Sequence, residues 1–356
     1  MSRRLPSILL LLGLVALACG TAAATEEHPE STGQPPPASS PKVPLKPLSG
    51  QVIVSYNVEN LFDTLNDPAT NDEDFLPGGR LHWTSARYRH KLEQLARAIS
   101  WAGPELPPIV GLTEVENRAV VEDLVHTRPL ADGGYTVVHF DSPDERGIDV
   151  ALLVRSSFAA VRKQEALKVP LGRDRTRDVL HAELELADSI VLHVFEDHWP
   201  SRREGTQESE PKRMAAARVV RGRVDDILAQ EPQAKVLIMG DFNDYPQDRS
   251  IQEGLRASCD LRSTADLIDL MCAGTSPKSV EGSYLHDGKW GYLDQMIVSR
   301  GLLAGKGPKA VSAQALWDER LMFKHPKFGL APNKTYNRDD YKGGFSDHLP
   351  VVLRIQ

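Results

Sequence analysis

The sequence predicts an α/β protein, and the alternation of two kinds of segment carries that prediction. From Gly50 to Gln356, short apolar runs typical of buried strands alternate with longer stretches whose apolar residues recur at helical spacing. No repeat of fixed period and no internal linker interrupts this part of the chain. Hydrophobic residues make up 41% and charged residues 26% of the 356 residues, which excludes a disordered, collagen-like or coiled-coil protein. We therefore expect one α/β domain over residues 50–356.

Strands are expected where apolar and β-branched residues run together between turn residues. The expected strands are Val52 to Tyr56, Pro108 to Thr113, Ile148 to Val154, Ile190 to Phe195, Lys235 to Met239 and Val351 to Ile355. Ser283 to Ser299 is expected to form a hairpin that turns at Asp287-Gly288. The apolar spacing predicts one helix from Thr84 to Trp101, capped by Thr84 or Ser85, and a second that opens at Pro211.

The first residues have the pattern of an export signal, which we assign to residues 1–24. Arg3 and Arg4 precede an apolar run from Ile8 to Ala18 that is too short for a membrane span. Two processing sites are open: cleavage after the alanines that end at Ala24, or a lipobox in which Cys19 is lipidated and becomes the first residue. We expect an exported protein, either secreted or held at the cell surface as a lipoprotein anchored to the membrane through Cys19.

Residues 25–49 are rich in proline and serine and lack apolar periodicity, so we expect a disordered tether. Beyond it, Cys259 and Cys272 are the cysteines of the mature chain. In an exported protein they either form a disulfide or remain two buried thiols.

The charge balance limits the function. The formal net charge of the chain is −7. A protein that coats nucleic acid is usually basic, so that class is disfavoured. An enzyme with a local metal site is still allowed, because the metal supplies positive charge.

Polar residues of a metal-binding type gather just beyond the predicted strands. They are Asn57, Glu59, Glu114, Asp197, His198, Asp241, Asn243, Asp294, Asp347 and His348. Strand ends are where α/β folds place ligand groups. Carboxylate and amide oxygens suit a hard divalent cation, and the absence of a cysteine cluster argues against structural zinc. Any one of these residues alone is more ordinary as a cap or turn residue.

The order of these segments resembles the endonuclease/exonuclease/phosphatase superfamily, from about Val52 to Leu353. The matching motifs are SYNVENLF, GLTEVEN, RGIDVALLV, DHWPSR, MGDFND, GYLDQMIVS and SDHLPVV. The resemblance implies a four-layered α/β sandwich, with two packed mixed sheets flanked by helices, and hydrolysis of a phosphoester with Mg²⁺ or Mn²⁺. One departure is Asp197, because many relatives have asparagine there. We expect its carboxylate to raise the pKa of His198 or to add a metal ligand.

The resemblance also implies residue roles. Glu114 is the expected principal metal ligand, with Asn57, Glu59 and Asp347 around it. The expected catalytic residues are Asp241 and Asn243 at the attacking water, His198 and His348 at the phosphoryl group, and Asp149 and Asp294 as their orienting partners. Asp149 is assigned to His198, and Asp294 to His348. Arg146, Arg177 and Arg202 are expected to hold the substrate phosphate.

The substrate is the least determined part. We expect a monomeric extracellular or surface-anchored nuclease that acts on nucleic acid, most simply DNA. The alternatives are a phosphodiesterase or phosphatase for lipid or inositol-phosphate head groups, and an inactive module that binds a surface. The segment from Lys324 to Lys342 is polar, aromatic and basic, and we expect it to form a loop over the site.

Overall fold

The computed structural model describes residues 44–272 and 282–356, which belong to one compact unit. The predicted signal peptide, Cys19 and most of the predicted tether lie outside the described residues. Residues 44–49 were expected to be disordered, and this is wrong. Lys46 N donates to Ser157 O at 2.7 Å, and Leu48 is buried in the core. No helix in the described residues is both long and apolar enough to span a membrane.

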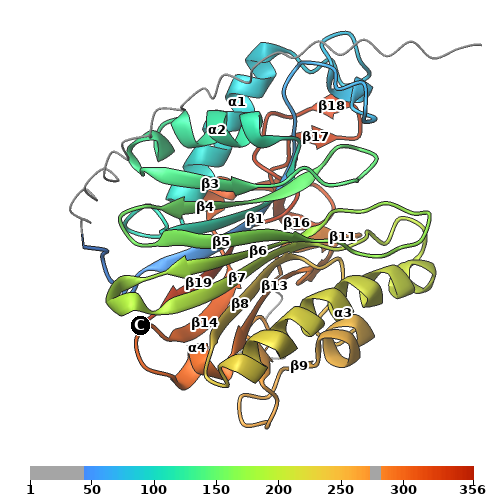
Figure 1. The fold of residues 1–356 in the computed structure, drawn as a ribbon. Coiled ribbons are helices and arrows are strands. Elements are labelled where there is room, and N and C mark those ends of the chain that lie inside the picture. Colours follow the sequence, from blue (N-terminus) through green and yellow to red (C-terminus); the bar gives the residue numbers. More distant parts are fainter. Residues whose placement is uncertain (1–43, 273–281) are drawn as a thin grey trace, which may run out of the picture. The chain divides into compact units, whose positions relative to one another are not determined.

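Two large mixed sheets form the centre of the domain (Figure 1). The first has the strand order β14-β19-β1-β2-β4-β3. Its strands are β14 (Ala310–Ala315), β19 (Val351–Ile355), β1 (Val52–Leu61), β2 (Ile109–Val115), β4 (Asp149–Arg155) and β3 (Tyr135–His139). β1 pairs in parallel with β2 and antiparallel with β19. Because β1 and β2 are covered on both faces, their sequences are nearly continuous apolar runs.

The second sheet has the order β5-β6-β7-β8-β13-β10-β9. Its strands are β5 (Ala160–Leu167), β6 (Val179–Glu185), β7 (Val191–His198), β8 (Lys235–Asp241), β13 (Asp294–Ser299), β10 (Leu267–Asp269) and β9 (Ala257–Ser258). β7 and β8 are parallel, and β13 runs antiparallel beside β8. The parallel pairs of both sheets therefore end at one edge of the domain.

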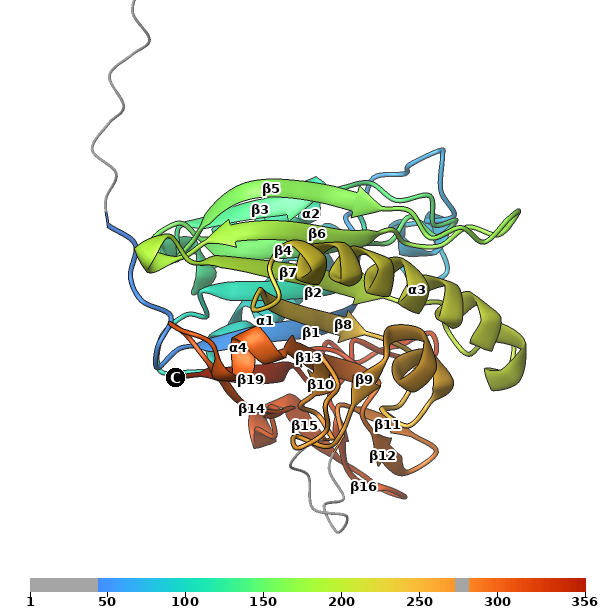
Figure 2. The ribbon, with the colours of Figure 1, turned by 60° about the horizontal axis from the view of Figure 1, so that its bottom comes forward.

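The helices cover the outer faces of the two sheets, which gives the four layers that the resemblance implied (Figure 2). They are α1 (Ser85–Ser100), α2 (Arg118–His126), α3 (Thr206–Gln230) and the short α4 (Arg300–Ala304). α1 and α2 pack on the first sheet, while α3 packs on the second with the π-helical segment Ser250–Leu255. A core of buried residues from β1, β2, β4, β7 and β8 fills the space between the sheets.

Helix α1 follows the expected pattern closely. The Thr84 side chain accepts from Arg87 N and caps the helix, while Leu92, Leu95 and Ile99 are buried on its inner face. Helix α3 begins at Thr206, five residues before Pro211. The prediction that Pro211 opens this helix is wrong, because Pro211 lies inside it.

Three small hairpins complete the described strands: β11 (Tyr284–His286) with β12 (Lys289–Gly291), β15 (Met322–His325) with β16 (Gly329–Pro332), and β17 (Tyr336–Asn337) with β18 (Asp340–Tyr341). The turn at Asp287-Gly288 is confirmed, and both residues have positive φ. The rest of the expected hairpin is wrong, because 294–299 form β13 in the large sheet. The expected loop at 324–342 is likewise two short hairpins and their connection.

Cys259 follows β9 directly, and Cys272 lies shortly after β10. The two cysteines form a disulfide. This resolves the open alternative in favour of the bridge.

Candidate active site

The strand order of the second sheet brings three predicted residues together. His198 ends β7 and is in register with Asp241 at the end of β8. Asp294 begins the antiparallel strand β13 and is also in register with Asp241. His348 precedes β19 in the first sheet and hydrogen-bonds to Asp294 across the two sheets. Residues separated by 150 positions in the sequence therefore meet at one edge.

The first sheet adds Asn57 and Glu114 from the parallel ends of β1 and β2. The register of this pair shifts between Asn57 and Leu61, and that of β2 with β4 shifts between Thr113 and Val115. Glu114 sits in the second irregularity with a φ of 66°. A bulge of this kind turns a side chain out of the regular strand alternation. Left-handed non-glycine residues are uncommon and gather at functional sites, and Asn243 has a φ of 49° in the same region.

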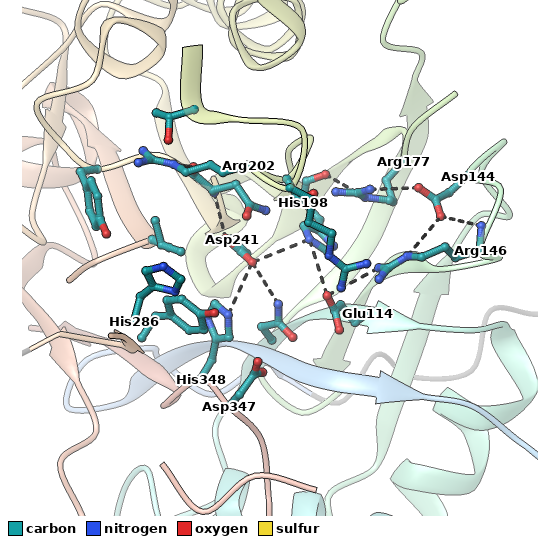
Figure 3. Close-up of a pocket in the computed structure, with 18 of the residues that line it drawn as sticks. Glu114, Asp144, Arg146, Arg177, His198, Arg202, Asp241, His286, Asp347 and His348 are labelled. Atoms are coloured by element: carbon teal, nitrogen blue, oxygen red, sulfur yellow. Dashed lines mark hydrogen bonds and ion pairs between the residues drawn. The ribbon is translucent and has the colours of Figure 1, made fainter. Parts of the chain in front are cut away.

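A cavity of about 560 Å³ opens over these residues (Figure 3). The predicted residues that line it are Asn57, Glu114, Arg146, Arg177, His198, Arg202, Asp241, Asn243, Asp347 and His348. This convergence from seven segments of the chain is the arrangement that the sequence predicted. Glu59, Asp149 and Asp294 do not line the cavity, for three different reasons.

Asp294 lies behind His348. Its Oδ2 is 2.8 Å from His348 Nδ1, so the imidazole presents Nε2 towards the cavity, 3.8 Å from Asp241 Oδ2. Burial lowers the pKa of His348, but the carboxylates of Asp294 and Asp241 outweigh it and hold the pKa well above the usual value. His348 is therefore a cationic donor. The expected pairing of Asp294 with His348 is present.

His198 differs from His348 in having no carboxylate behind it. Its Nδ1 is buried without a hydrogen-bond partner among the described residues, and its Nε2 lies 3.7 Å from Asp241 Oδ2 and 3.9 Å from Glu114 Oε1. Burial, and then the charges of Arg177 and Arg146, hold the pKa of His198 well below its usual value. The site thus contains one cationic and one neutral imidazole.

Asp149 was expected to orient His198, and this is wrong. Its Oδ2 lies 3.0 Å from Nε2 of His139, and its Oδ1 accepts from Ser142 N at 2.8 Å. His139 ends β3, and β3 pairs with β4. The carboxylate at the start of β4 therefore lies beside that histidine. Neither His139 nor Asp149 lines the cavity.

Asp197 also has a different role from the expected one. Its Oδ1 accepts from Trp199 Nε1 at 2.8 Å, and its side chain points away from His198, because successive side chains of a strand alternate in direction. Burial raises the pKa of Asp197 to about 7. It therefore neither keeps His198 cationic nor lies among the groups that line the cavity.

Asp241 is the centre of the hydrogen-bond network. Its Oδ2 accepts from Asn57 Nδ2 at 3.0 Å and its Oδ1 from Asn243 N at 2.9 Å. Asn243 Nδ2 in turn donates to Trp199 O. Burial raises the pKa of Asp241, against the opposing effect of the cationic His348. Asp241 is fixed in position and buried, as a group that handles a proton must be.

The oxygen donors of the cavity are of the kind that a hard divalent cation prefers. Three residues that line the cavity supply these oxygens. Glu114 and Asp347 supply carboxylates, and Asn57 supplies an amide. Burial raises the pKa of Asp347, and the nearby carboxylate of Glu114 raises it further. Two negative charges in one site repel each other, which favours the protonated form. Such a set fits Mg²⁺ or Mn²⁺.

Glu59 was expected to be a further metal ligand, but the structure does not bring it into this cavity. Its Oε2 accepts from Thr335 N at 2.6 Å and its Oε1 from Tyr336 N at 3.3 Å. Glu59 itself has a φ of 51°, which turns its side chain towards this segment. Its carboxylate therefore anchors the connection between β16 and β17 beside the site.

The three predicted arginines differ in whether their guanidinium groups already bind other groups of the protein. Arg177 is buried and donates to the carbonyl oxygens of His198 and Trp199 and to Asp144. Arg202 donates to Asn243 O and to Asp244, and its guanidinium lies over the Tyr245 ring. These two arginines shape the cavity, whereas Arg146 is one third exposed and lies 3.6 Å from Glu114 Oε1.

The residues that line the cavity without having been predicted include Tyr284, His286, Arg175 and Arg203. Arg175 and Arg203 are exposed, and both lie in arginine-rich stretches that the sequence displays. Tyr284 pairs with His348 through an isolated bridge, and their rings are 4.6 Å apart. Only this tertiary contact brings Tyr284 to the site, so periodicity gave no signal for it.

The fold and the site place the chain among known proteins. Residues 52–356 match the model of the Endonuclease/Exonuclease/phosphatase family, and the chain belongs to this family. A comparison with curated proteins gave no significant match.

Solved structures share the fold at low sequence identity. A mannosyl-6-phosphatase of Bacteroides thetaiotaomicron is 15% identical, with a TM-score of 0.55 over 86% of this chain and 99% of that one. TDP2 of D. rerio in complex with a single-strand DNA product is 15% identical, with a TM-score of 0.54 over 86% and 98%. Truncated TDP2 of Caenorhabditis elegans is 18% identical, with a TM-score of 0.51 over 86% and 98%. At these identities the likeness concerns the fold alone.

Proposed function

We propose that this protein is a divalent-metal-dependent phosphodiesterase, and more specifically a nuclease. The observation that carries the proposal is the convergence of Glu114, Asp241 and the His348–Asp294 pair in one cavity. An oxygen-rich cation site next to a fixed buried carboxylate and a cationic imidazole is suited to hydrolysis of a negatively charged ester. The presence of all these groups argues against an inactive binding module.

Glu114, Asp347 and Asn57 are the residues that would hold Mg²⁺ or Mn²⁺. When bound, the cation supplies positive charge to the phosphoryl oxygens and the leaving group.

The protein's own residues provide the remaining functions. Asp241, held by Asn57 and by the backbone of Asn243, orients the attacking water and takes its proton. His348, kept cationic by Asp294, donates from Nε2 to the phosphoryl group. His198, which is neutral, offers its Nε2 from the opposite side of Asp241. The two imidazoles thus flank the reacting phosphorus with different charges.

The distribution of charge around the cavity favours a diester of a polyanion. Arg146, Arg175 and Arg203 line the cavity, where they would hold further phosphates of a strand. A single phosphomonoester would need fewer cations. The net charge of −7 makes these arginines a local feature and not a property of the whole surface. Export and anchoring through Cys19 stay predictions from the sequence.

The test compares the mature wild-type protein with Glu114→Gln on plasmid DNA, RNA, sphingomyelin and bis-p-nitrophenyl phosphate. We expect hydrolysis of nucleic acid with Mg²⁺ or Mn²⁺, loss of activity with EDTA, and a fall of about 10²-fold or more in Glu114→Gln. Mg²⁺ should raise the melting temperature of the wild type but not of Glu114→Gln.

Glu116→Gln is the matched control, because Glu116 lies two residues further along and binds Asp63 N outside the cavity. Full Mg²⁺-dependent activity of Glu114→Gln would contradict the proposed site. Hydrolysis of sphingomyelin but not of nucleic acid would assign the alternative, a head-group phosphodiesterase.

A further inference from the structure

A second cavity, of about 700 Å³, opens beside the active-site cavity. The two cavities share Tyr284, His286 and Asp347. Its volume is in the range of pockets that enclose a small organic group. Because it is continuous with the site, a substrate whose phosphorus lies at Asp241 and His348 can extend one substituent into it. We refer to it as the aromatic pocket.

One wall of the aromatic pocket is the hairpin β11–β12. The Tyr284 ring lies 4.6 Å from the His348 ring, and the His286 ring is nearly parallel to Tyr284 at 6.3 Å. These rings therefore form a row that starts at the proposed proton donor and leads away from it. His286 is largely exposed, so its outer face is free to accept another ring.

The opposite wall is the hairpin β15–β16. His325 Nδ1 accepts from the backbone N–H groups of Lys327 and Phe328, which fixes the imidazole plane. The Phe328 ring stacks on His325 at 4.7 Å. Phe323, on the same hairpin, is 38% exposed where it lines the pocket. Phe323 therefore offers part of an aromatic ring to the pocket.

The two hairpins are held at a fixed separation. An ideal Cβ at Gly288 would lie 2.5 Å from Phe328 Cδ1, so the turn of one hairpin packs directly against the ring of the other. Gly288 also has a φ of 77°, which favours glycine independently of this contact. The pocket is therefore lined by two hairpins that pack against each other at the Gly288 turn.

Polar groups are placed around the aromatic walls. Asn333 and Asn337 contribute amides, and Lys334 and Lys342 contribute cations. Lys342 also forms an ion pair with Asp340. Amides read hydrogen-bonding edges, stacked rings hold planar faces, and lysines attract phosphate. A lipid tail would use none of these polar groups.

We propose that the aromatic pocket binds the nucleobase next to the scissile phosphate, by stacking between the His286 and Phe323 walls. This proposal rests on the proposed phosphodiesterase function and adds to it a binding site for a base. The substrate strand would cross the site with further phosphates along Arg175 and Arg203 and with one base in the pocket. The base selects the substrate, whereas Asp241 and His348 act on the phosphate.

The test uses thymidine dinucleotide TpT and two dimers in which one base is replaced by hydrogen on a tetrahydrofuran sugar, one at each position. These substrates keep the same ester and leaving-group type. In the wild type, loss of one of the two bases should lower kcat/KM by about 5- to 150-fold, the range for stacking of one base. Loss of the other base should have a smaller effect.

Phe323→Ala removes the exposed wall, and His286→Ala is a second variant at a largely exposed position. Both should reduce the discrimination to less than about threefold. Leu330→Ala is the matched control, because Leu330 is 45% exposed on the same hairpin but does not line the pocket. It should keep the wild-type discrimination.

The same dimers are also compared by calorimetry with Ca²⁺ in place of Mg²⁺. Tighter binding of TpT than of the base-lacking dimer, lost in Phe323→Ala, supports the pocket even if no dimer is cleaved, an outcome that would count only against the proposed function. Equal rates and equal affinities for all dimers would overturn the pocket proposal and leave the hydrolase standing. So would unchanged discrimination in both Phe323→Ala and His286→Ala.

Discussion

The Nδ1 atom of His348 lies 2.8 Å from Oδ2 of Asp294, and both side chains are buried where the two sheets meet. His348 comes from the segment before β19 in the first sheet and Asp294 from β13 in the second. The hydrogen bond therefore joins the two halves of the sandwich at the site itself. It fixes both the direction and the charge of the imidazole.

Asp294→Asn should lower kcat on bis-p-nitrophenyl phosphate by about 10²- to 10⁴-fold with little change in KM. The carboxylate raises the pKa of His348, so its removal lowers that pKa and leaves His348 neutral at a lower pH. The alkaline fall of the pH–rate profile should accordingly move to lower pH. Initial rates across a pH series measure both effects.

Asp149→Asn is the matched control for this experiment, because Asp149 forms the other buried carboxylate–histidine pair, with His139. We expect unchanged kcat and an unchanged pH profile, whatever the effect on melting temperature. A loss of activity equal to that of Asp294→Asn, in a folded protein, would restore the role that the sequence suggested for Asp149.

Asp197→Asn should leave kcat within about threefold of the wild type, because the Asp197 side chain contacts Trp199 and not His198. If the carboxylate instead acted on His198, its removal would alter the acidic limb of the pH–rate profile. Steady-state kinetics between pH 5 and 9 distinguish the two. A shifted acidic limb would contradict the geometry described above.

Asp269 should make the protein less stable as the pH rises. It is fully buried in β10, Oδ2 has no hydrogen-bond partner within the described residues, and burial raises its pKa to about 7. In the unfolded chain its pKa is about 4, so the folded state binds the proton more tightly. The associated stability is complete below about pH 4 and is lost as the pH rises through about 7.

Asp269→Asn removes this titration while keeping the shape of the side chain. Between pH 5 and pH 8 the wild type should lose up to about 3 kcal/mol of unfolding free energy relative to Asp269→Asn. Urea unfolding of the disulfide-bonded proteins at both pH values measures this loss of unfolding free energy. Asp287→Asn, at a position that is 91% exposed, should follow the wild type. Parallel curves for the wild type and Asp269→Asn would refute the prediction.

Gly111 makes room for Glu196 between the sheets. An ideal Cβ at Gly111 in β2 would lie 1.7 Å from Glu196 Oε2 in β7, and Glu196 is fully buried with Oε1 bonded to Ser55 Oγ. Gly111→Ala should therefore lower the unfolding free energy by about 1–3 kcal/mol.

The same substitution in a Glu196→Ala background should have almost no effect, because the clashing carboxylate is gone. A double-mutant cycle by urea unfolding should give a coupling of at least about 1 kcal/mol. Additive effects of the two substitutions would show that the sheets adjust at this point and would contradict the prediction.

The sequence by itself determined which segments become the central strands and which polar residues follow them. Val52 to Tyr56 and Lys235 to Met239 are mostly apolar, so they were expected in the interior, with Asn57 and Asp241 just beyond them. Helix α1 was equally well specified by its cap and its apolar face. These are local properties, which the chain displays in its own order.

Only the tertiary structure decided which partners these residues have. Asp149 meets His139 because β3 pairs with β4, and Glu59 meets Thr335 because the backbone of Glu59, within β1, is left-handed. Tyr284 reaches His348 through a bridge between segments more than sixty residues apart. Hydrogen-bond partners depend on register and bulges between distant strands, and a shift of one residue turns a side chain to the opposite face.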